Sequence, residues 1–284
     1  MKGSTGNLRQ LFLAGTASAA LFMSTSASAI DVDAGDYQAA PPGTNLGLLY
    51  LQHASRDVLN TDIGILRLVH FTEIGGMVAD PQVLIPFGRL SGRDGLAGES
   101  ASGFGDVIFA STFWPQNDPD RGVWTGFTPY LYVPTGEYDR NNELNLGENR
   151  WKFNLQVAHV RRLSERFSID LVGDVMIHGD NKDFGPTGQT MSQDPLYQAQ
   201  GWLRYHLSPT SDLRFLVSHV WGGETSVDGV DRDDRASTTK VGFGGSFFVG
   251  PKTQIIAIAG RDTSNQVDAL KEDGRVNIRI LRIF

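Results

Sequence analysis

Two adjacent runs of alternating residues, 151–162 and 167–178, constrain the fold of this chain more than any other feature. Apolar side chains hold most odd positions, while polar ones such as Lys152, Asn154 and Asp170 occur on the even positions. A period of two identifies strands with two unlike faces, and the short polar stretch between the runs predicts a hairpin. Each strand has about the length that a tilted strand needs to cross a bilayer, roughly eleven residues.

The same rhythm recurs along the chain, and long polar connections alternate with short turns from the third strand on. This alternation is typical of bacterial outer-membrane barrels. We therefore expect an all-β fold: a transmembrane antiparallel up-and-down barrel of about twelve strands, with long extracellular loops and short periplasmic turns. The predicted strands are 45–54, 61–71, 78–90, 104–114, 123–133, 151–162, 167–178, 196–207, 213–221, 239–249, 253–262 and 275–284.

The first three predicted strands follow the pattern least well. Alternation is poor in 45–54 and 61–71, and Arg67 interrupts an apolar set. Pro81 and Pro86 lie in the third strand, where proline cannot donate to a ladder. The boundaries of these strands are therefore the least well defined.

The first 29 residues resemble a secretory signal, with a charged start, a short apolar run and a small-residue motif ending at Ala29. Cleavage near Ala29 would export the protein, and we expect it in the outer membrane of a Gram-negative bacterium. Residues 30–43 are polar and end in a proline pair, which predicts a periplasmic N-terminal segment or a small plug. Residues 44–284 then form the barrel.

The charge of the chain argues against one class of partner. Loss of Lys2 and Arg9 with the signal would change the formal net charge from -7 to -9, because all 32 acidic residues remain. Nucleic-acid binding requires basic patches, so no nucleic-acid partner is expected. The expected partners are outer-membrane lipid and lipopolysaccharide, the barrel-insertion machinery and a small hydrophobic solute.

The chain ends on Phe284, after a run that alternates apolar and polar residues. This resembles the terminal strand signal by which outer-membrane proteins engage the insertion machinery, and it assigns Phe284 that role. Arg282 shares a face with Phe284, where the signal usually has an apolar residue. A long arginine near the rim can extend its charged head to the lipid headgroups.

Polar residues on the even face of five predicted strands form the candidate functional constellation. They carry both signs, and charges facing a narrow lumen normally pair across it, because an isolated buried charge is costly. Two interpretations remain open: an ion-pair network that fills the barrel, or the wall of a solute path. The predicted lumen-lining residues are Lys152, Asn154, Gln156, Asp170, Asp174, Gln198, Gln200, Arg204, Arg214 and Lys240.

Motifs for catalysis or cofactors are missing from the sequence. There is no Gly-rich phosphate loop, no His-Glu-x-x-His and no cysteine. A Ser-His pair on the outer wall would indicate a lipid-acting enzyme, but no serine has a Gly-x-Ser-x-Gly setting. The acidic stretch 228–234 lacks the glycine and distal glutamate of a calcium loop. We expect no enzyme, no metal and no cofactor.

Ala34-Gly35-Asp36-Tyr37, followed by Pro41-Pro42-Gly43-Thr44-Asn45-Leu46, resembles the start of the meta-pathway phenol-degradation family. One departure is Ala40, where family members carry leucine. The resemblance implies an exported outer-membrane barrel with a transport role. It also implies a substrate class of small hydrophobic or aromatic molecules, and it carries over no catalytic residues.

The expected function is therefore passive uptake of small hydrophobic or aromatic compounds through an outer-membrane channel. Two alternatives belong to other classes of protein. One is a lipid-acting outer-membrane enzyme, and the other is a structural barrel with a plugged lumen.

Overall fold

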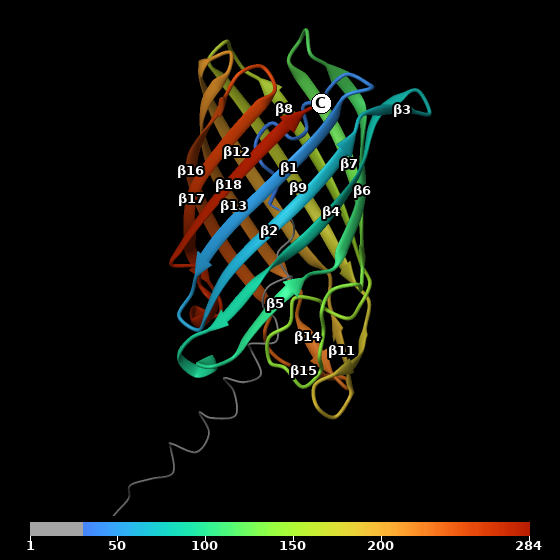
Figure 1. Cartoon of the computed structure of the whole chain (residues 1–284), viewed down its shortest axis with the longest axis vertical. Coiled ribbons are helices and arrows are strands. Elements are labelled where there is room, and N and C mark those ends of the chain that lie inside the picture. The colour runs from blue at the N-terminus through green and yellow to red at the C-terminus, as the bar shows by residue number, and fades with distance from the viewer. Residues whose placement is uncertain (1–30) are drawn as a thin grey trace, which may run out of the picture.

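The computed structural model describes residues 31–284, so the predicted signal in residues 1–29 lies outside the described part of the chain. Within residues 31–284, twelve long strands form one closed antiparallel wall (Figure 1). These strands are β1 (Asn45–Ser55), β2 (Leu59–His70), β4 (Met77–Gly92), β6 (Val107–Asp118), β7 (Val123–Val133), β8 (Lys152–Arg162), β9 (Phe167–His178), β12 (Leu196–Ser208), β13 (Ser211–Gly222), β16 (Ala236–Phe248), β17 (Thr253–Asn265) and β18 (Gly274–Ile283).

Pairing between the first and last strands closes the barrel. β1 and β18 run antiparallel, with Leu46 opposite Ile283 and Ser55 opposite Gly274. Every other long strand pairs with its neighbours in chain order, as an up-and-down barrel requires. Closure leaves no free sheet edge. The predicted fold class is confirmed.

The two ends of the barrel differ in their connections. One end, here called the short-turn end, carries tight turns such as 163–166 and 249–252, together with both Asn45 and Phe284. The Phe284 amide donates to the Asn45 carbonyl at 3.0 Å. The opposite end, here called the long-loop end, carries the long connections (Figure 1). This alternation agrees with the prediction.

The long loops contain short strands that the sequence pattern does not predict. β10 (Asn181–Phe184), β11 (Gln189–Gln193), β14 (Thr225–Val227) and β15 (Val230–Asp231) form a separate small sheet. β5 (Ser100–Phe104) pairs with an extended β4. The remaining elements of residues 31–284 are the helical turns η2 (Asp94–Leu96) and η3 (Asp268–Leu270) and, at the short-turn end, the strand β3 (Thr72–Ile74). Most residues of these loop strands are polar, so the strands show no alternation of apolar and polar residues.

One predicted boundary is wrong for a related reason. The strand predicted at 104–114 begins instead at Val107 and continues to Asp118. Phe104 belongs to β5, and Asp106 accepts hydrogen bonds from the Gly136 and Glu148 amides, which ends one strand and starts the next.

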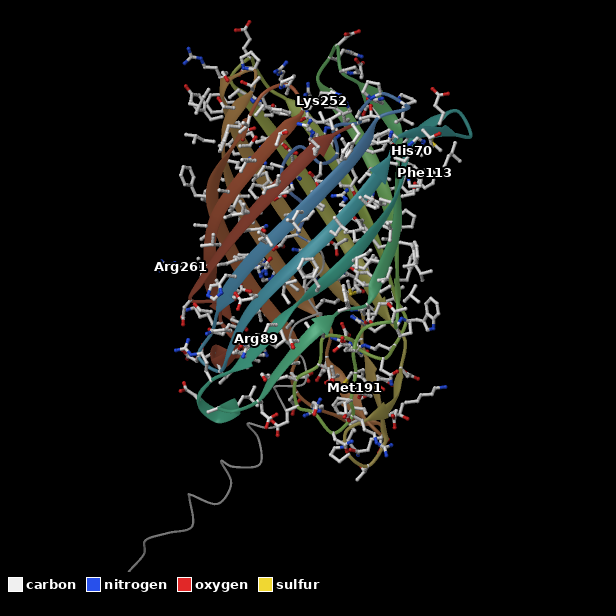
Figure 2. The ribbon with its side chains drawn as sticks, in the orientation of Figure 1. His70, Arg89, Phe113, Met191, Lys252 and Arg261 are labelled. Atoms are coloured by element: carbon white, nitrogen blue, oxygen red, sulfur yellow. The ribbon has the colours of Figure 1, made fainter. Side chains whose placement is uncertain are left out.

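The side chains are arranged inversely to those of a soluble protein. Trp151 is 53% exposed and the outward Phe153, Leu155 and Val157 of β8 are exposed too, whereas Gln156 is fully buried. Figure 2 shows rings such as Phe113 on the outer wall. An apolar exterior around a polar interior suits lipid outside and a wet or hydrogen-bonded lumen inside. No helix in residues 31–284 has the length and apolarity to cross a membrane.

Candidate functional site

Residues 31–43, here called the N-terminal segment, enter the barrel interior. The Val32 amide donates to Gln200 at 3.2 Å, and the Gly35 amide donates to Asp170 at 2.7 Å. Indole and guanidinium groups bind its carbonyls: Trp202 donates to Val32 at 2.9 Å and Arg214 donates to Ala34 at 3.1 Å. Backbone groups that would be unpaired inside a barrel are thus satisfied by the wall. These contacts attach the segment to β9, β12 and β13.

Tyr37 anchors the segment to another part of the wall. Its hydroxyl lies 2.7 Å from the Thr128 hydroxyl and donates to Gln156 at 3.0 Å. The Trp114 indole donates to the Tyr37 carbonyl at 2.9 Å. Gly126 makes room for the ring, since a Cβ there would lie 2.9 Å from the Tyr37 ring. The sequence therefore provides a glycine where the segment approaches β7.

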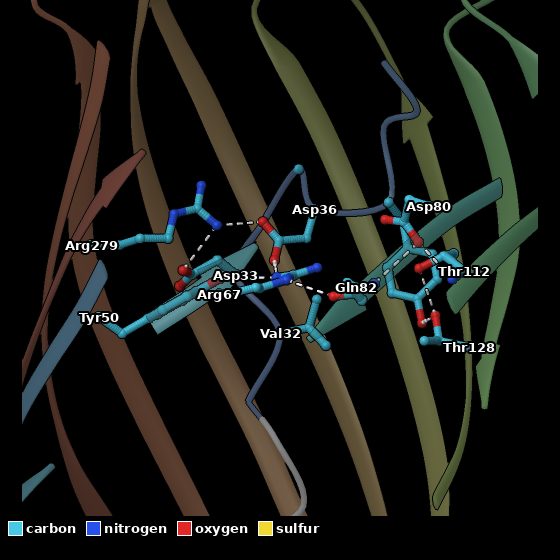
Figure 3. Close-up of polar contacts among 12 residues, drawn as sticks. Val32, Asp33, Asp36, Tyr50, Arg67, Asp80, Gln82, Thr112, Thr128 and Arg279 are labelled. Carbon is cyan, nitrogen blue, oxygen red and sulfur yellow. Dashed lines mark hydrogen bonds and ion pairs between the residues drawn. The ribbon is translucent and has the colours of Figure 1, made fainter. Parts of the chain in front are cut away.

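Three aspartates of the segment meet cations of β16 and β18. Asp31 lies 2.9 Å from both Lys240 and Arg275. Asp33 lies 3.1 Å from Arg279, which also pairs closely with Asp36 (Figure 3). Buried charges are stabilised only when they are paired, so these contacts fix the segment electrostatically to β16 and β18.

Arg67 is the centre of a second polar group. It donates to Asp36 and to the Tyr50 hydroxyl at 2.9 Å each, and to Gln82 at 2.7 Å (Figure 3). Gln82 in turn donates to Asp80 at 3.1 Å. This chain of contacts joins the segment to β1, β2 and β4.

The ten predicted lumen residues all project inward, where nine are buried and Lys240 is partly buried. Seven of them contact the N-terminal segment: Gln156, Asp170, Gln198, Gln200, Arg204, Arg214 and Lys240. Asn154 instead donates to Asp174 at 2.9 Å, and Asp174 also accepts from Gln156. Lys152 pairs with Glu148 at the long-loop end, away from the segment.

Sequence reasoning missed the interior residues of β1, β2 and β18. Tyr50 of β1 and Ile63 and Ile65 of β2 face inward, so these two strands are apolar on both faces and lose the alternation. Arg67 shares the parity of Ile63 and Ile65, and this was the signal that it also faces inward. Arg275 and Arg279 alternate with the exposed apolar residues of β18 in the same way.

In the described residues 31–284, cavities lie beside the segment toward both ends of the barrel. One of about 170 Å³ lies toward the long-loop end, where Arg56 and Thr61 contribute to its wall. A larger one of about 600 Å³ is lined by short-turn residues such as Arg162 and Arg166. Asp36 and Arg67 line both cavities, so this ion pair lies between them.

Ion pairs at the long-loop end stabilise the ordered loops. Glu272 accepts from Arg56 at 2.5 Å and from Arg275 at 2.6 Å. Burial alone would raise the pKa of Glu272, but Lys240, Arg275 and Arg56 outweigh burial and lower the pKa to about 2. Burial opposes ionisation of Glu148 as well, and its two cationic neighbours hold its pKa well below the usual range. Both carboxyl groups are therefore ionised at neutral pH.

A Ser-His contact does occur, but on the inner wall. Ser168 and His206 lie 2.7 Å apart, and Ser168 is only 2% exposed. His206 has no hydrogen bond to a carboxylate within residues 31–284. An outer-wall pair reachable by lipid, which the enzyme alternative requires, is not formed by these two residues.

Phe284 lies at the outer rim of the short-turn end. It is 70% exposed, and its ring approaches Gly47 so closely that a Cβ there would lie 3.1 Å away. Arg282 is exposed on the same face and donates to Thr253 at 2.7 Å.

Comparison with known proteins agrees with this architecture. The family described as "Putative MetA-pathway of phenol degradation" matches residues 37–280. An outer membrane channel from Pseudomonas putida F1 is similar at 38% identity and a TM-score of 0.85, over 89% of this chain and 100% of that chain. No curated protein matches significantly.

A more distant structure shares the fold alone. The translocator domain of the autotransporter NalP from Neisseria meningitidis is 10% identical, with a TM-score of 0.52, over 87% of this chain and 90% of that chain. The structural neighbours are thus membrane barrels and not enzymes. The extent of the family match and the likeness to the Pseudomonas channel show that the chain belongs to this phenol-degradation family and forms an outer-membrane barrel of the channel type.

Proposed function

We propose that the barrel admits small, uncharged hydrophobic or aromatic solutes by passive diffusion past the N-terminal segment. The observation that carries this proposal is that Asp36 and Arg67 border both cavities. This ion pair thus lies between space on the long-loop side and space on the short-turn side. Movement of the segment over a short distance would join the two.

The charge distribution favours uncharged solutes. The six connections at the long-loop end (56–58, 93–106, 134–151, 179–195, 223–235 and 266–273) hold 19 acidic and 8 basic residues. A mouth of one sign repels solutes of the same sign, so anions would be disfavoured at entry. Inside, cations such as Arg67, Arg275 and Arg279 are paired with aspartates, which leaves few free carboxylates for a cationic solute.

The proposal includes export and assembly. Removal of residues 1–29 would leave the mature chain beginning directly before Asp31. Lipid and lipopolysaccharide would contact the apolar outer wall, and the barrel-insertion machinery would recognise the strand that ends in Phe284. Nucleic acid has no part in this function.

Conductance and uptake measurements test the proposal. Single-channel recordings in planar bilayers should show small openings for the intact mature chain and larger ones after deletion of residues 30–43. Liposomes containing the protein should take up phenol or toluene faster than protein-free liposomes. Equal uptake by both would contradict the proposal, and no conductance even after the deletion would favour a structural barrel instead.

A further inference from the structure

The smaller cavity has an apolar inner wall that is unusual for this barrel. Ile63 and Ile65 of β2 and Leu84 of β4 line it, together with the rings of Tyr50 and Tyr130. Tyr50 lies directly opposite Ile65 in the β1–β2 ladder, so the ring and the aliphatic chain form one continuous patch. The N-terminal segment closes the other side.

The size of this space fits one ring. Its volume is about 170 Å³. An engineered apolar cavity of about 150 Å³ stays dry and binds benzene. The cavity is therefore large enough for a benzene ring with one small substituent and too small for two fused rings with substituents.

The charged groups around the cavity are already neutralised. Arg67 pairs with Asp36 at 2.9 Å, Arg56 pairs with Glu272 at 2.5 Å, and Arg275 pairs with Glu272 and Asp31. A carboxylate or ammonium group on the solute would find no free counter-charge here, and burying it unpaired would be costly. The ligand is thus uncharged.

One polar atom of the wall lacks a partner. Tyr130 donates its hydroxyl to Gln156 at 3.2 Å, and the Tyr50 oxygen accepts from Arg67. Asn277 Oδ1 is buried and accepts no hydrogen bond from any group in residues 31–284. A buried acceptor without a donor is costly, so a ligand that brings a hydroxyl would be favoured over a plain hydrocarbon.

We propose that this cavity is a binding subsite for a neutral single-ring aromatic alcohol, with the ring against Ile63, Ile65 and Leu84 and the hydroxyl donating to Asn277 Oδ1. The proposal rests on the proposed channel function in that the solute reaches the cavity from the long-loop end. The hydroxyl selects among aromatic solutes, and the ring size limits them.

Binding to the purified mature chain in detergent tests the subsite. Titration calorimetry with phenol, toluene and benzoate should rank phenol first and benzoate last. Ile65→Trp fills the cavity and should weaken phenol binding more than tenfold. Leu66→Trp is the matched control, because Leu66 is the next residue of β2, points outward and is 39% exposed. This control should bind phenol like the unaltered protein.

A second variant tests the hydroxyl contact without filling the space. Asn277→Leu should weaken phenol binding about tenfold, as expected for one lost hydrogen bond, and leave toluene binding unchanged or stronger. Equal phenol binding by the unaltered protein, Ile65→Trp and Asn277→Leu would overturn the subsite. If phenol uptake into liposomes persists while these variants bind phenol equally, the subsite is contradicted but the channel function is supported. Site-specific binding without uptake would support the subsite and contradict the channel.

Discussion

The Asp36 carboxylate accepts a hydrogen bond from Arg67 at 2.9 Å, and this pair lies between the two interior cavities. Asp36 belongs to the N-terminal segment, whereas Arg67 belongs to the fixed wall of the barrel. The boundary between the cavities therefore includes a contact between side chains of the segment and of the wall. Truncation of one side chain can test it.

Asp36→Ala should increase single-channel conductance and lower stability. The substitution removes the carboxylate shared by Arg67 and Arg279, although Arg279 keeps Asp33. Loss of one partner from a buried pair costs roughly 3 kcal/mol. Planar-bilayer recording and urea unfolding in detergent would measure the two effects.

Asp62→Ala is the control for that experiment. Asp62 lies on β2, as Arg67 does, and pairs with His53 across the β1–β2 ladder. Both of these side chains are more than half exposed. Exposed pairs contribute about 0–1 kcal/mol, so conductance and stability should change little. If Asp36→Ala behaves like Asp62→Ala, the pair does not separate the cavities.

Gly126→Leu should displace Tyr37 from its place against β7. A Cβ at this position would lie 2.9 Å from the Tyr37 ring and 3.2 Å from the Phe113 carbonyl oxygen. Overpacking of this kind costs about 1–3 kcal/mol and would loosen the segment. Conductance should rise while the barrel remains folded by circular dichroism.

Gly173→Leu provides the comparison, because the nearest atom to a Cβ at that outward glycine lies 3.8 Å away. It should leave conductance unchanged. A rise in both variants would mean that leucine acts through the barrel wall and not through Tyr37.

The sequence predicts the strands of the barrel better than the arrangement of the segment and cavities inside it. β8, β9 and β12 alternate strictly, because one face meets lipid and the other meets polar groups. That contrast disappears in β1 and β2, where Tyr50 and Ile65 make the inner face apolar as well. Poor alternation there reflects the cavity and not a lack of strand structure.

The path of the N-terminal segment could not be derived from local pattern. Its contacts join residues far apart in sequence, such as Asp31 with Arg275 and Tyr37 with Thr128. Charge type gave a partial indication, because the three aspartates of the segment complement cations of the wall. The cavity between segment and wall depends on three-dimensional placement and has no sequence signature of its own.

Acid should destabilise the long-loop end through Glu272. Its folded pKa is about 2, below the ordinary value of 4.5, so its ion pairs contribute fully above about pH 4.5. That contribution is lost as the pH falls from 4.5 toward 2, because protonation then competes with the bonds to Arg56 and Arg275. Melting temperatures measured across this range should fall.

Glu272→Gln isolates this contribution from the other acidic groups. It should melt at a lower temperature than the unaltered protein at pH 7, and the difference should shrink as the pH approaches 2. A difference that stays constant down to pH 2 would show that ionisation of Glu272 does not stabilise the fold.

Phe284→Ala should reduce the amount of protein assembled in the outer membrane without greatly changing the stability of the folded barrel. Phe284 is 70% exposed and contacts the wall mainly at Gly47, so its truncation removes little buried area and should cost less than about 1 kcal/mol. Its role in recognition by the insertion machinery would instead appear during assembly. Heat-modifiable bands from outer-membrane fractions measure assembly, and melting of protein refolded in detergent measures stability.

Phe247→Ala is the matched control, because Phe247 is another exposed aromatic residue near the short-turn end, and this variant should assemble normally. Equal assembly of the two variants would contradict a special role for the terminal residue, whereas a large loss of stability in Phe284→Ala alone would assign it a structural one.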